Sequence, residues 1–324
     1  MNRRTLPYDH VPLRGHAGFT LIELMVAMVL GLLIIVGVLS VFLANKQTYG
    51  RSEDLSLYQE KARFVSDLLT QDIRQADGTP CRKRDTSYPI NQVDTDLDWG
   101  EEEEGIEGYS GDPNSEIPDE VDFGTGVADR VAGTDALRVT GTLGVVFSVL
   151  SCTHPTFTLN YPPGVTAHGF DDSSNLIVCY FDTEYATLFV KAGSSASTVS
   201  YDSDNASLCE KYLQNSLISE ASQVLWYLGC NGLPDKPCNT PAGRSLYRNY
   251  RNTARPVIDG VADLQIEYLS RDGTAYEELA NAWGDVVAVR LTLDLEPPQP
   301  GAGENTPPTP RLLQVIALRN RIPL

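Results

Sequence analysis

The apolar run GFTLIELMVAMVLGLLIIVGVLSVFLA, from Gly18 to Ala44, contains a single charged side chain, Glu23. As a helix, the segment from Phe19 to Ala44 would rise roughly 39 Å at about 1.5 Å per residue, more than the roughly 30 Å of bilayer hydrocarbon. The run therefore predicts a helix that spans a membrane. A carboxylate inside such a span costs about 2.5–3.5 kcal/mol on insertion scales, so Glu23 requires a partner.

An amine would lie one helical turn from Glu23 if the chain were cut between Gly18 and Phe19. At about 4 Å and an effective dielectric constant near 20, the attraction is roughly 4 kcal/mol, comparable with the insertion cost. The sequence Gly-Phe-Thr-Leu-Ile-Glu resembles the processing site of type IV prepilins and type II secretion pseudopilins. The resemblance implies that a prepilin peptidase cuts after Gly18 and N-methylates Phe19. It also implies that Glu23 pairs with the terminal amine of a neighbouring subunit during assembly.

Two simpler interpretations of the apolar run are a signal peptide and a plain membrane anchor. A signal peptide typically has a shorter apolar region, of about 7–15 residues, and a small residue three positions before its cut. For a cut after Ala44 that position is occupied by the large side chain of Phe42, so the pattern does not fit. A plain anchor explains the length and the basic residues Arg3, Arg4 and Arg14 on the cytoplasmic side, but leaves Glu23 unexplained.

The composition of the chain is acidic. Loss of residues 1–18, which carry three Arg and one Asp, would change the net charge from −18 to −20. Such a surface disfavours direct nucleic-acid binding, which relies on clustered Lys and Arg. The prepilin resemblance implies that the partners are the inner membrane, the prepilin peptidase and other pilins.

Six cysteines follow the predicted leader, and an even number in a chain facing an oxidising compartment predicts disulfides. Cys230 and Cys238 flank the segment NGLPDKP, whose Gly and two Pro bend the chain, so we expect these two to pair. The remaining cysteines allow several pairings. We expect Cys179 to pair with Cys209 and Cys81 with Cys152.

The sequence predicts no catalytic site, cofactor or metal centre. It has no GxxxxGK[ST], GxGxxG, GxSxG or HExxH motif, and no CxxC pair for zinc. The stretch from Asp94 has the spaced carboxylates of a calcium loop, but Trp99 and Gly105 occupy positions that the EF-hand pattern reserves for Gly and Glu. A looser calcium site within residues 94–107 is the alternative to a solvated acidic loop.

The helical pattern continues beyond the membrane segment. Apolar residues recur at steps of three and four, at Leu55, Tyr58, Ala62, Val65, Leu69 and Ile73. Asp67 and Asp72 belong to the other, charged faces, which we expect to lie in water. The sequence Asp77-Gly-Thr-Pro predicts the end of the helix. We therefore expect a leader at 1–18, a transmembrane helix at 19–44 and an amphipathic continuation at 45–77.

The remainder divides into an insertion and a head. Residues 78–135 are rich in Asp, Glu and Gly and predict an acidic, loop-rich surface insertion. Residues 136–324 contain short runs of β-branched and aromatic residues without helical crossovers, which predict an antiparallel sheet. Within one run, Leu264, Ile266 and Tyr268 would share a buried face. The Pro-rich stretch 297–310 predicts a stiff exposed connection. The predicted fold class is α+β, with a long N-terminal helix packed on a β-sheet head.

The distal half of the chain carries a second resemblance. The runs LWYLG at Trp226, SLYRNY at 245–250, VIDGVADLQIEYLSRDG at 257–273, WGDVVAVRLTL at 283–293 and ALRNRIP at 317–323 look like those of the PilW family of type IV minor pilins. The resemblance implies a non-catalytic protein of the bacterial inner membrane, with its head in the periplasm. Such a protein joins other minor pilins and the major pilin in a complex that primes the pilus and sits at its tip. The acidic insertion and the Pro-rich stretch depart from the family pattern.

Two alternatives to a minor pilin remain. One is the J-type pseudopilin of type II secretion, which has the same leader, long helix and β-rich head. The other is a tip adhesin, in which the head binds a ligand that the sequence does not name.

Overall fold

The computed structural model describes residues 20–81, 90–93, 95, 97, 99, 105–115, 118, 121–180, 185–193, 195–202, 208–296 and 309–321. The chain forms two compact units, Met1–Ser56 and Leu57–Leu324. The predicted leader, the Gly18–Phe19 cleavage site, the aspartates of the calcium alternative and most of the Pro-rich stretch lie outside the described residues.

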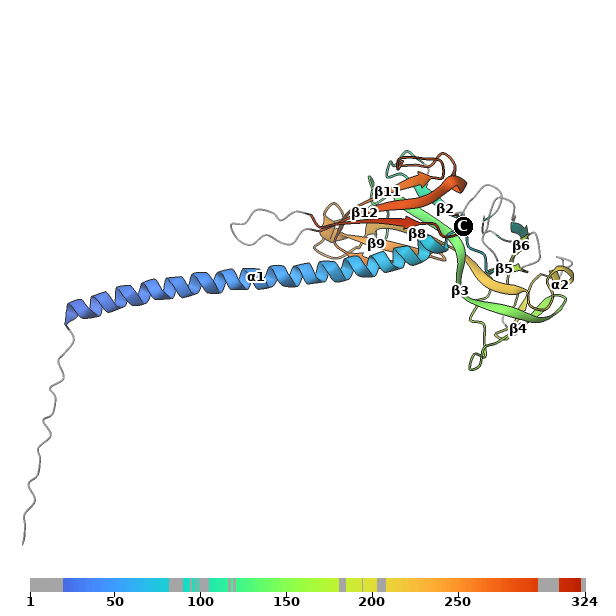
Figure 1. The fold of residues 1–324 in the computed structure, drawn as a ribbon, viewed down its shortest axis with the longest axis horizontal. Coiled ribbons are helices and arrows are strands. Elements are labelled where there is room, and N and C mark those ends of the chain that lie inside the picture. The colour runs from blue at the N-terminus through green and yellow to red at the C-terminus, as the bar shows by residue number, and fades with distance from the viewer. Residues whose placement is uncertain are drawn as a thin grey trace, which may run out of the picture. The chain divides into compact units, whose positions relative to one another are not determined.

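Helix α1 is continuous from Leu21 to Gln75 and contains 55 residues (Figure 1). No proline interrupts this stretch, and the helix continues from the apolar run into the periodic segment that follows it. The helix ends because Asp77 adopts a left-handed φ of 62° while the Gly78 N–H donates to the Gln75 carbonyl oxygen at 3.0 Å. The helix therefore ends next to the sequence Asp77-Gly-Thr-Pro, as predicted.

The second unit contains two sheets. The larger sheet has ten strands: β1 (Ile90–Val93), β2 (Ile106–Tyr109), β3 (Ala136–Thr153), β4 (Thr156–Asn160), β5 (Asn175–Cys179), β6 (Ala186–Val190), β7 (Thr198–Ser200), β8 (Leu217–Cys230), β9 (Arg244–Tyr250) and β10 (Thr253–Asp259). The smaller sheet has β11 (Val261–Ser270), β12 (Val286–Leu295) and β13 (Arg311–Ala317), in that order. Short helices lie at Leu208–Lys211 (α2), Pro241–Gly243 (η1) and Trp283–Asp285 (η2).

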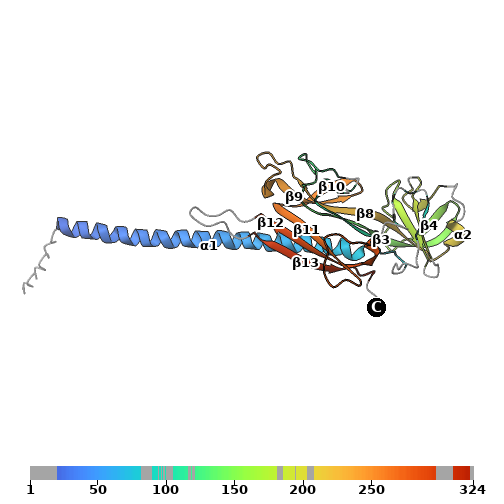
Figure 2. The same ribbon diagram turned by 90° about the horizontal axis from the view of Figure 1, so that it is seen from above.

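The long strands β3 and β8 pair antiparallel and connect two lobes of the second unit (Figure 2). The proximal lobe contains the end of α1 and strands β9–β13, and the distal lobe contains β4–β7 and α2. On its other edge β8 changes partner: residues 217–220 pair with β5, and residues 224–230 pair with β9. Among the described strands, none pairs with residues 221–223 of β8 on this edge.

The pairing is antiparallel except between β1 and β6, which run parallel. The predicted α+β class with an antiparallel head is confirmed for residues 136–324, and the structure adds that the head contains two sheets and a parallel strand, β1, from the segment before it. The prediction that residues 78–135 form a surface insertion was wrong in part, because β1 and β2 join the larger sheet and Trp99 is fully buried. Several apolar residues of this acidic segment, among them Ile90, Trp99, Ile106 and Tyr109, are buried, a placement that average composition does not reveal.

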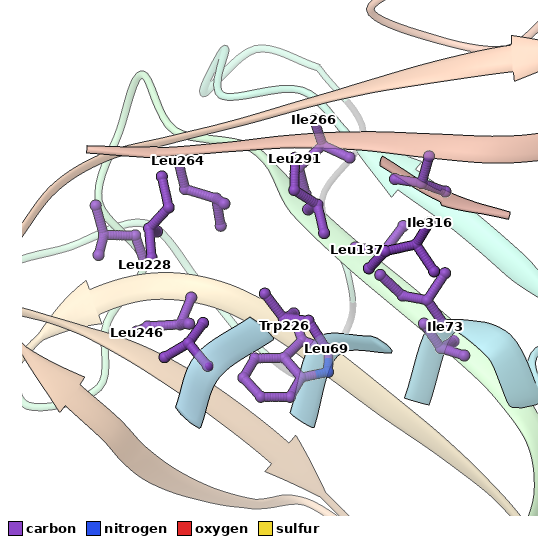
Figure 3. Packing of buried hydrophobic residues seen from close by; sticks show 14 of the residues in the cluster. Leu69, Ile73, Leu137, Trp226, Leu228, Leu246, Leu264, Ile266, Leu291 and Ile316 are labelled. Atoms are coloured by element: carbon purple, nitrogen blue, oxygen red, sulfur yellow. The ribbon is translucent and has the colours of Figure 1, made fainter. Parts of the chain in front are cut away.

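The proximal core combines α1 with both sheets (Figure 3). It contains Val65, Leu69 and Ile73 of α1, Leu137, Trp226, Leu228 and Leu246 of the larger sheet, and Leu264, Ile266, Leu291 and Ile316 of the smaller sheet. Burial of each such side chain contributes roughly 1.5–3 kcal/mol. The predicted buried alternation of β11 is confirmed, whereas Leu55, predicted to join the stripe of α1, is exposed.

Candidate functional site: the N-terminal segment of α1

The first turn of α1 is closed by a reciprocal capping box between Thr20 and Glu23. The Thr20 backbone N–H and Oγ1 donate to Glu23 Oε2 at 3.0 and 3.1 Å, and the Glu23 N–H donates to Thr20 Oγ1 at 3.3 Å. These bonds satisfy backbone donors that a helix start leaves unpaired, and they place a negative charge at the positive end of the helix dipole. The sequence interpretation of Glu23 missed this role, although the pattern T-x-x-E signals it.

The second carboxylate oxygen of Glu23 is not used by this box. Among the residues from Thr20 onward that the structure describes, no donor bonds to Oε1, and the side chain is exposed. The carboxylate can therefore cap its own helix through Oε2 and still accept a donor from another molecule through Oε1.

The segment of α1 that follows is apolar on all its faces. Each of its large hydrophobic side chains from Leu21 to Leu43 is more than half exposed. The helix is long and apolar enough to cross a membrane, with a mean hydropathy of 3.0 over its most apolar 18-residue window and none of that window buried. A helix that is apolar all round requires a lipid or protein environment.

Asp72, predicted to face water, is buried at 4% exposure in the last turn of α1. Its Oδ2 accepts from Arg248 Nε at 2.7 Å and from Trp226 Nε1 at 2.9 Å, and its Oδ1 accepts from Arg248 Nη2 at 3.1 Å. A carboxylate at a helix C-terminus is unfavourable in the field of the helix dipole, and the guanidinium of β9 offsets this. Asp72 therefore attaches α1 to the centre of the larger sheet.

A second buried carboxylate, Asp77, lies just after the helix. Its Oδ2 accepts from Arg321 Nε at 3.1 Å and its Oδ1 accepts from Trp99 Nε1 at 3.3 Å. Asn320 Nδ2 donates to the Ala76 carbonyl oxygen at 2.9 Å. Asn320 and Arg321 belong to the run ALRNRIP, so in this chain the run holds the end of α1.

All six cysteines are paired in the structure. Cys230 pairs with Cys238, as expected from the bent segment between them, with a Cα–Cα distance of 5.2 Å. The other two expected pairings were wrong: Cys81 pairs with Cys179 at 5.9 Å, and Cys152 pairs with Cys209 at 5.3 Å. The reason is topological, because the chain after α1 reaches the end of β5, and the end of β3 reaches α2.

A half-buried carboxylate, Asp135, connects the two sheets of the head. Asp135 accepts from the Ile266 N–H of β11 at 2.8 Å and from the Gly111 N–H at 3.2 Å, and burial raises the pKa of this carboxyl. Desolvation lowers the pKa of Arg130 to about 10, so its guanidinium stays protonated at neutral pH. Its Nη2 donates to the carbonyl oxygens of Tyr109, Ser110 and Thr134 at 2.7–3.0 Å. These contacts are structural, and no metal-binding cluster of His, Cys, Asp or Glu occurs among the described residues.

Comparison with known families matches the prokaryotic N-terminal methylation motif to residues 13–39. This stretch includes Gly18, Phe19, the capping box and the start of the apolar helix. Comparison with curated proteins gave no match, and comparison with solved structures gave none. The motif supports a protein of the type IV pilin or pseudopilin class that takes part in pilus or secretion assembly.

Proposed function

We propose that this protein is a type IV minor pilin of the PilW kind, which primes pilus assembly with other minor pilins and has no catalytic role. In this proposal the chain is cut after Gly18 and methylated on the amine of Phe19. The observation that carries the proposal is the carboxylate of Glu23, which stands at the start of an apolar helix with one oxygen open to an external donor.

The physical argument is that a carboxylate among apolar helices requires a counter-charge. A neighbouring subunit supplies one in the amine of its own Phe19, and the attraction of roughly 4 kcal/mol at about 4 Å offsets the cost of insertion. Removal of residues 1–18 leaves Thr20 in place, so the capping box survives processing. Intramolecular capping and intermolecular pairing therefore use different oxygens of the same side chain.

The three disulfides support a head in an oxidising compartment, since such bonds persist in the bacterial periplasm and are rare in the cytosol. With an N-terminal membrane helix, this gives a single-pass protein of the inner membrane whose head is periplasmic. The basic residues before the helix favour the same orientation.

Processing is tested by mass spectrometry of the N-terminal peptide of the membrane-extracted protein. We expect a mature chain that begins at methylated Phe19. A mature terminus near Asn45, as a signal peptidase would leave, overturns the assignment.

Assembly is tested by co-purification of partner pilins with two variants. Glu23→Val removes the carboxylate and should insert normally, because it removes a cost, but recover less of the partner pilins. Thr20→Ala is the matched control: it weakens the helix cap by roughly 1 kcal/mol and keeps the charge, so partner recovery should stay near wild type. Normal recovery with Glu23→Val refutes the pairing.

A strain that lacks the gene for this protein distinguishes a minor pilin from a J-type pseudopilin. We expect loss of surface pili and twitching, continued release of type II substrates, and recovery of some fibres when pilus retraction is blocked. The last result follows because nucleation by major pilin alone is rare, and rare fibres then accumulate. Normal pili with substrates retained in the periplasm would identify the pseudopilin instead.

A further inference from the structure

Strand β13 forms an open edge of the smaller sheet. It is the last strand in the order β11–β12–β13, and Figure 2 shows it at the outer side of this sheet. Among the described strands and bridges, only β12 pairs with it. The pairing extends over all seven residues of β13 without a bulge. A free edge of this length and regularity can accept a further strand.

The register determines which backbone groups of β13 point to the open edge. Before the strand, the Leu295 N–H donates to the Pro310 carbonyl oxygen at 2.9 Å. After it, the Leu318 N–H donates to the Val287 carbonyl oxygen at 2.9 Å. Residues of an antiparallel strand alternately bond to the neighbouring strand and point away from it. The even-numbered residues of β13 therefore bond to β12, whereas the odd-numbered residues from 311 to 317 direct their N–H and C=O groups to the open edge.

The open edge also has an apolar face. Gln314, one of the even-numbered residues, points to α1, where its Nε2 donates to Thr70 Oγ1 at 2.6 Å. Leu313 and Val315 lie on the opposite face of the strand and are 61% and 55% exposed. Edge strands are commonly protected by a charge, a proline or a bulge, and β10 has both Pro256 and a register shift after it. The centre of β13 has none of these protections, so apolar side chains of an added strand could cover Leu313 and Val315.

Arginines accompany the open edge on the side of α1. Arg74 follows Thr70 by one helical turn and Arg63 precedes it by two, so both lie on the side of the helix that faces β13. Arg319 comes two residues after the end of β13. All three side chains are exposed, and none forms an ion pair with a residue that the structure describes. The open edge is therefore bordered by unpaired positive charge.

This local charge is opposite to that of the whole chain, which has 43 acidic and 25 basic residues. Between residues 63 and 74 of α1, Asp67 is the one exposed carboxylate, since Asp72 is buried. Complementary charge favours an acidic partner at such a surface. A second copy of β13 fits less well, because residues 311–317 contain no carboxylate that could face the arginines.

We propose that β13 binds an extended segment of a partner protein, in which apolar and acidic residues alternate, as a fourth strand of the smaller sheet. The main chain of the segment bonds to the open N–H and C=O groups of β13. Because a strand changes face at every residue, its apolar side chains cover Leu313 and Val315 while its carboxylates face Arg63 and Arg74. The inference goes beyond the assembly function, because it uses neither the cleavage site nor the capping box.

The test is fluorescence anisotropy with the full chain in a zwitterionic detergent. The probe is a labelled peptide of the length of β13 in which valine and glutamate alternate, and a second peptide has lysine in place of glutamate. We expect the glutamate peptide to bind more tightly than the lysine peptide and to bind more weakly as salt is added. Hydrogen exchange at the Leu313 and Val315 N–H groups should become slower when the glutamate peptide is bound, because these groups then form hydrogen bonds.

Two variants test the edge itself. Val315→Pro removes an N–H that points to the open edge and leaves the bonds to β12 in place, so it should bind the glutamate peptide roughly tenfold more weakly. Val315→Thr is the matched control: it keeps the N–H and should bind within about threefold of the wild type. Leu313→Asp keeps every backbone group and places a negative charge beside the acidic segment, so it should also bind roughly tenfold more weakly. Thermal unfolding of each variant verifies that the sheet is intact.

A further pair of variants tests the charges. Arg63→Gln combined with Arg74→Gln should weaken binding of the glutamate peptide roughly fivefold at low salt and reduce its dependence on salt. Arg255→Gln, at an exposed arginine of β10, is the matched control and should bind like the wild type.

The proposal is supported if the glutamate peptide slows exchange along β13 and Val315→Pro binds it more weakly than Val315→Thr. It is overturned by no binding of the glutamate peptide, by equal binding to these two variants, or by equally tight binding of the lysine peptide. It is also overturned if the chain dimerises in sedimentation experiments and Val315→Pro abolishes the dimer, because a second copy of β13 then occupies the edge.

Discussion

Replacement of Asp72 by alanine tests how α1 is attached to the head. The change leaves the donors of Arg248 and Trp226 without their acceptor. Removing one partner of a fully buried ion pair costs about 3–5 kcal/mol, but the Arg248 side chain is 27% exposed and water recovers part of this. Trp226 is fully buried, and its orphaned N–H costs about 1–3 kcal/mol. We expect a total loss of about 3 kcal/mol.

The assay is thermal unfolding of the full chain in detergent micelles, followed by the circular dichroism of the β-sheets. For a unit of this size, about 2–4 °C per kcal/mol converts the expected loss to a fall in Tm of roughly 6–12 °C. Asp67→Ala is the matched control, because Asp67 lies on the same helix and is exposed. We expect it to change stability by less than about 0.5 kcal/mol.

A double-mutant cycle isolates the ion pair from other effects of the substitution. Asp72→Ala and Arg248→Ala should show a coupling energy of about 1–3 kcal/mol, since the side chains are in direct contact. The reasoning is refuted if Asp72→Ala behaves like the Asp67 control, or if the two substitutions are additive.

Three further predictions concern the head. Loss of the disulfide that closes the longest loop, by Cys81→Ala with Cys179→Ala, should lower the free energy of unfolding by roughly 2–5 kcal/mol in urea titration; a change below about 1 kcal/mol would contradict this. Gly108→Ala should reduce folded yield, because a Cβ would lie 2.0 Å from the buried Tyr268 hydroxyl; a wild-type Tm would show that the ring moves aside. A hydrogen bond from Arg290 on β12 lowers the pKa of Glu267. The contribution of Glu267 to the free energy of unfolding is therefore present above pH 4.5 and is lost as the pH falls through the lowered pKa. Glu267→Gln should therefore flatten the acid limb of a stability–pH curve, and an unchanged limb would exclude this group.

Local patterns in the sequence determined several features of this protein. The apolar run and the periodic positions after it predicted one continuous helix, because a helix depends on residues three and four apart. The alternation around Leu264 predicted the buried face of β11, because a strand changes face at every residue. The bent segment between Cys230 and Cys238 predicted their pairing, since the two sulfurs belong to a short loop.

Only the tertiary structure decided which distant residues meet. The partners of Cys81 and Cys152 depend on where β3 and β5 end, and no spacing along the chain encodes this. Asp72 has the charge pattern of a solvated helix face, yet it is buried because Arg248, 176 residues away, packs against it. Strand β8 pairs first with β5 and then with β9, and no local pattern in the sequence marks this change of partner. Sequence periodicity assigns each strand its faces, whereas the choice of neighbouring strand depends on long-range contacts that form only in the folded chain.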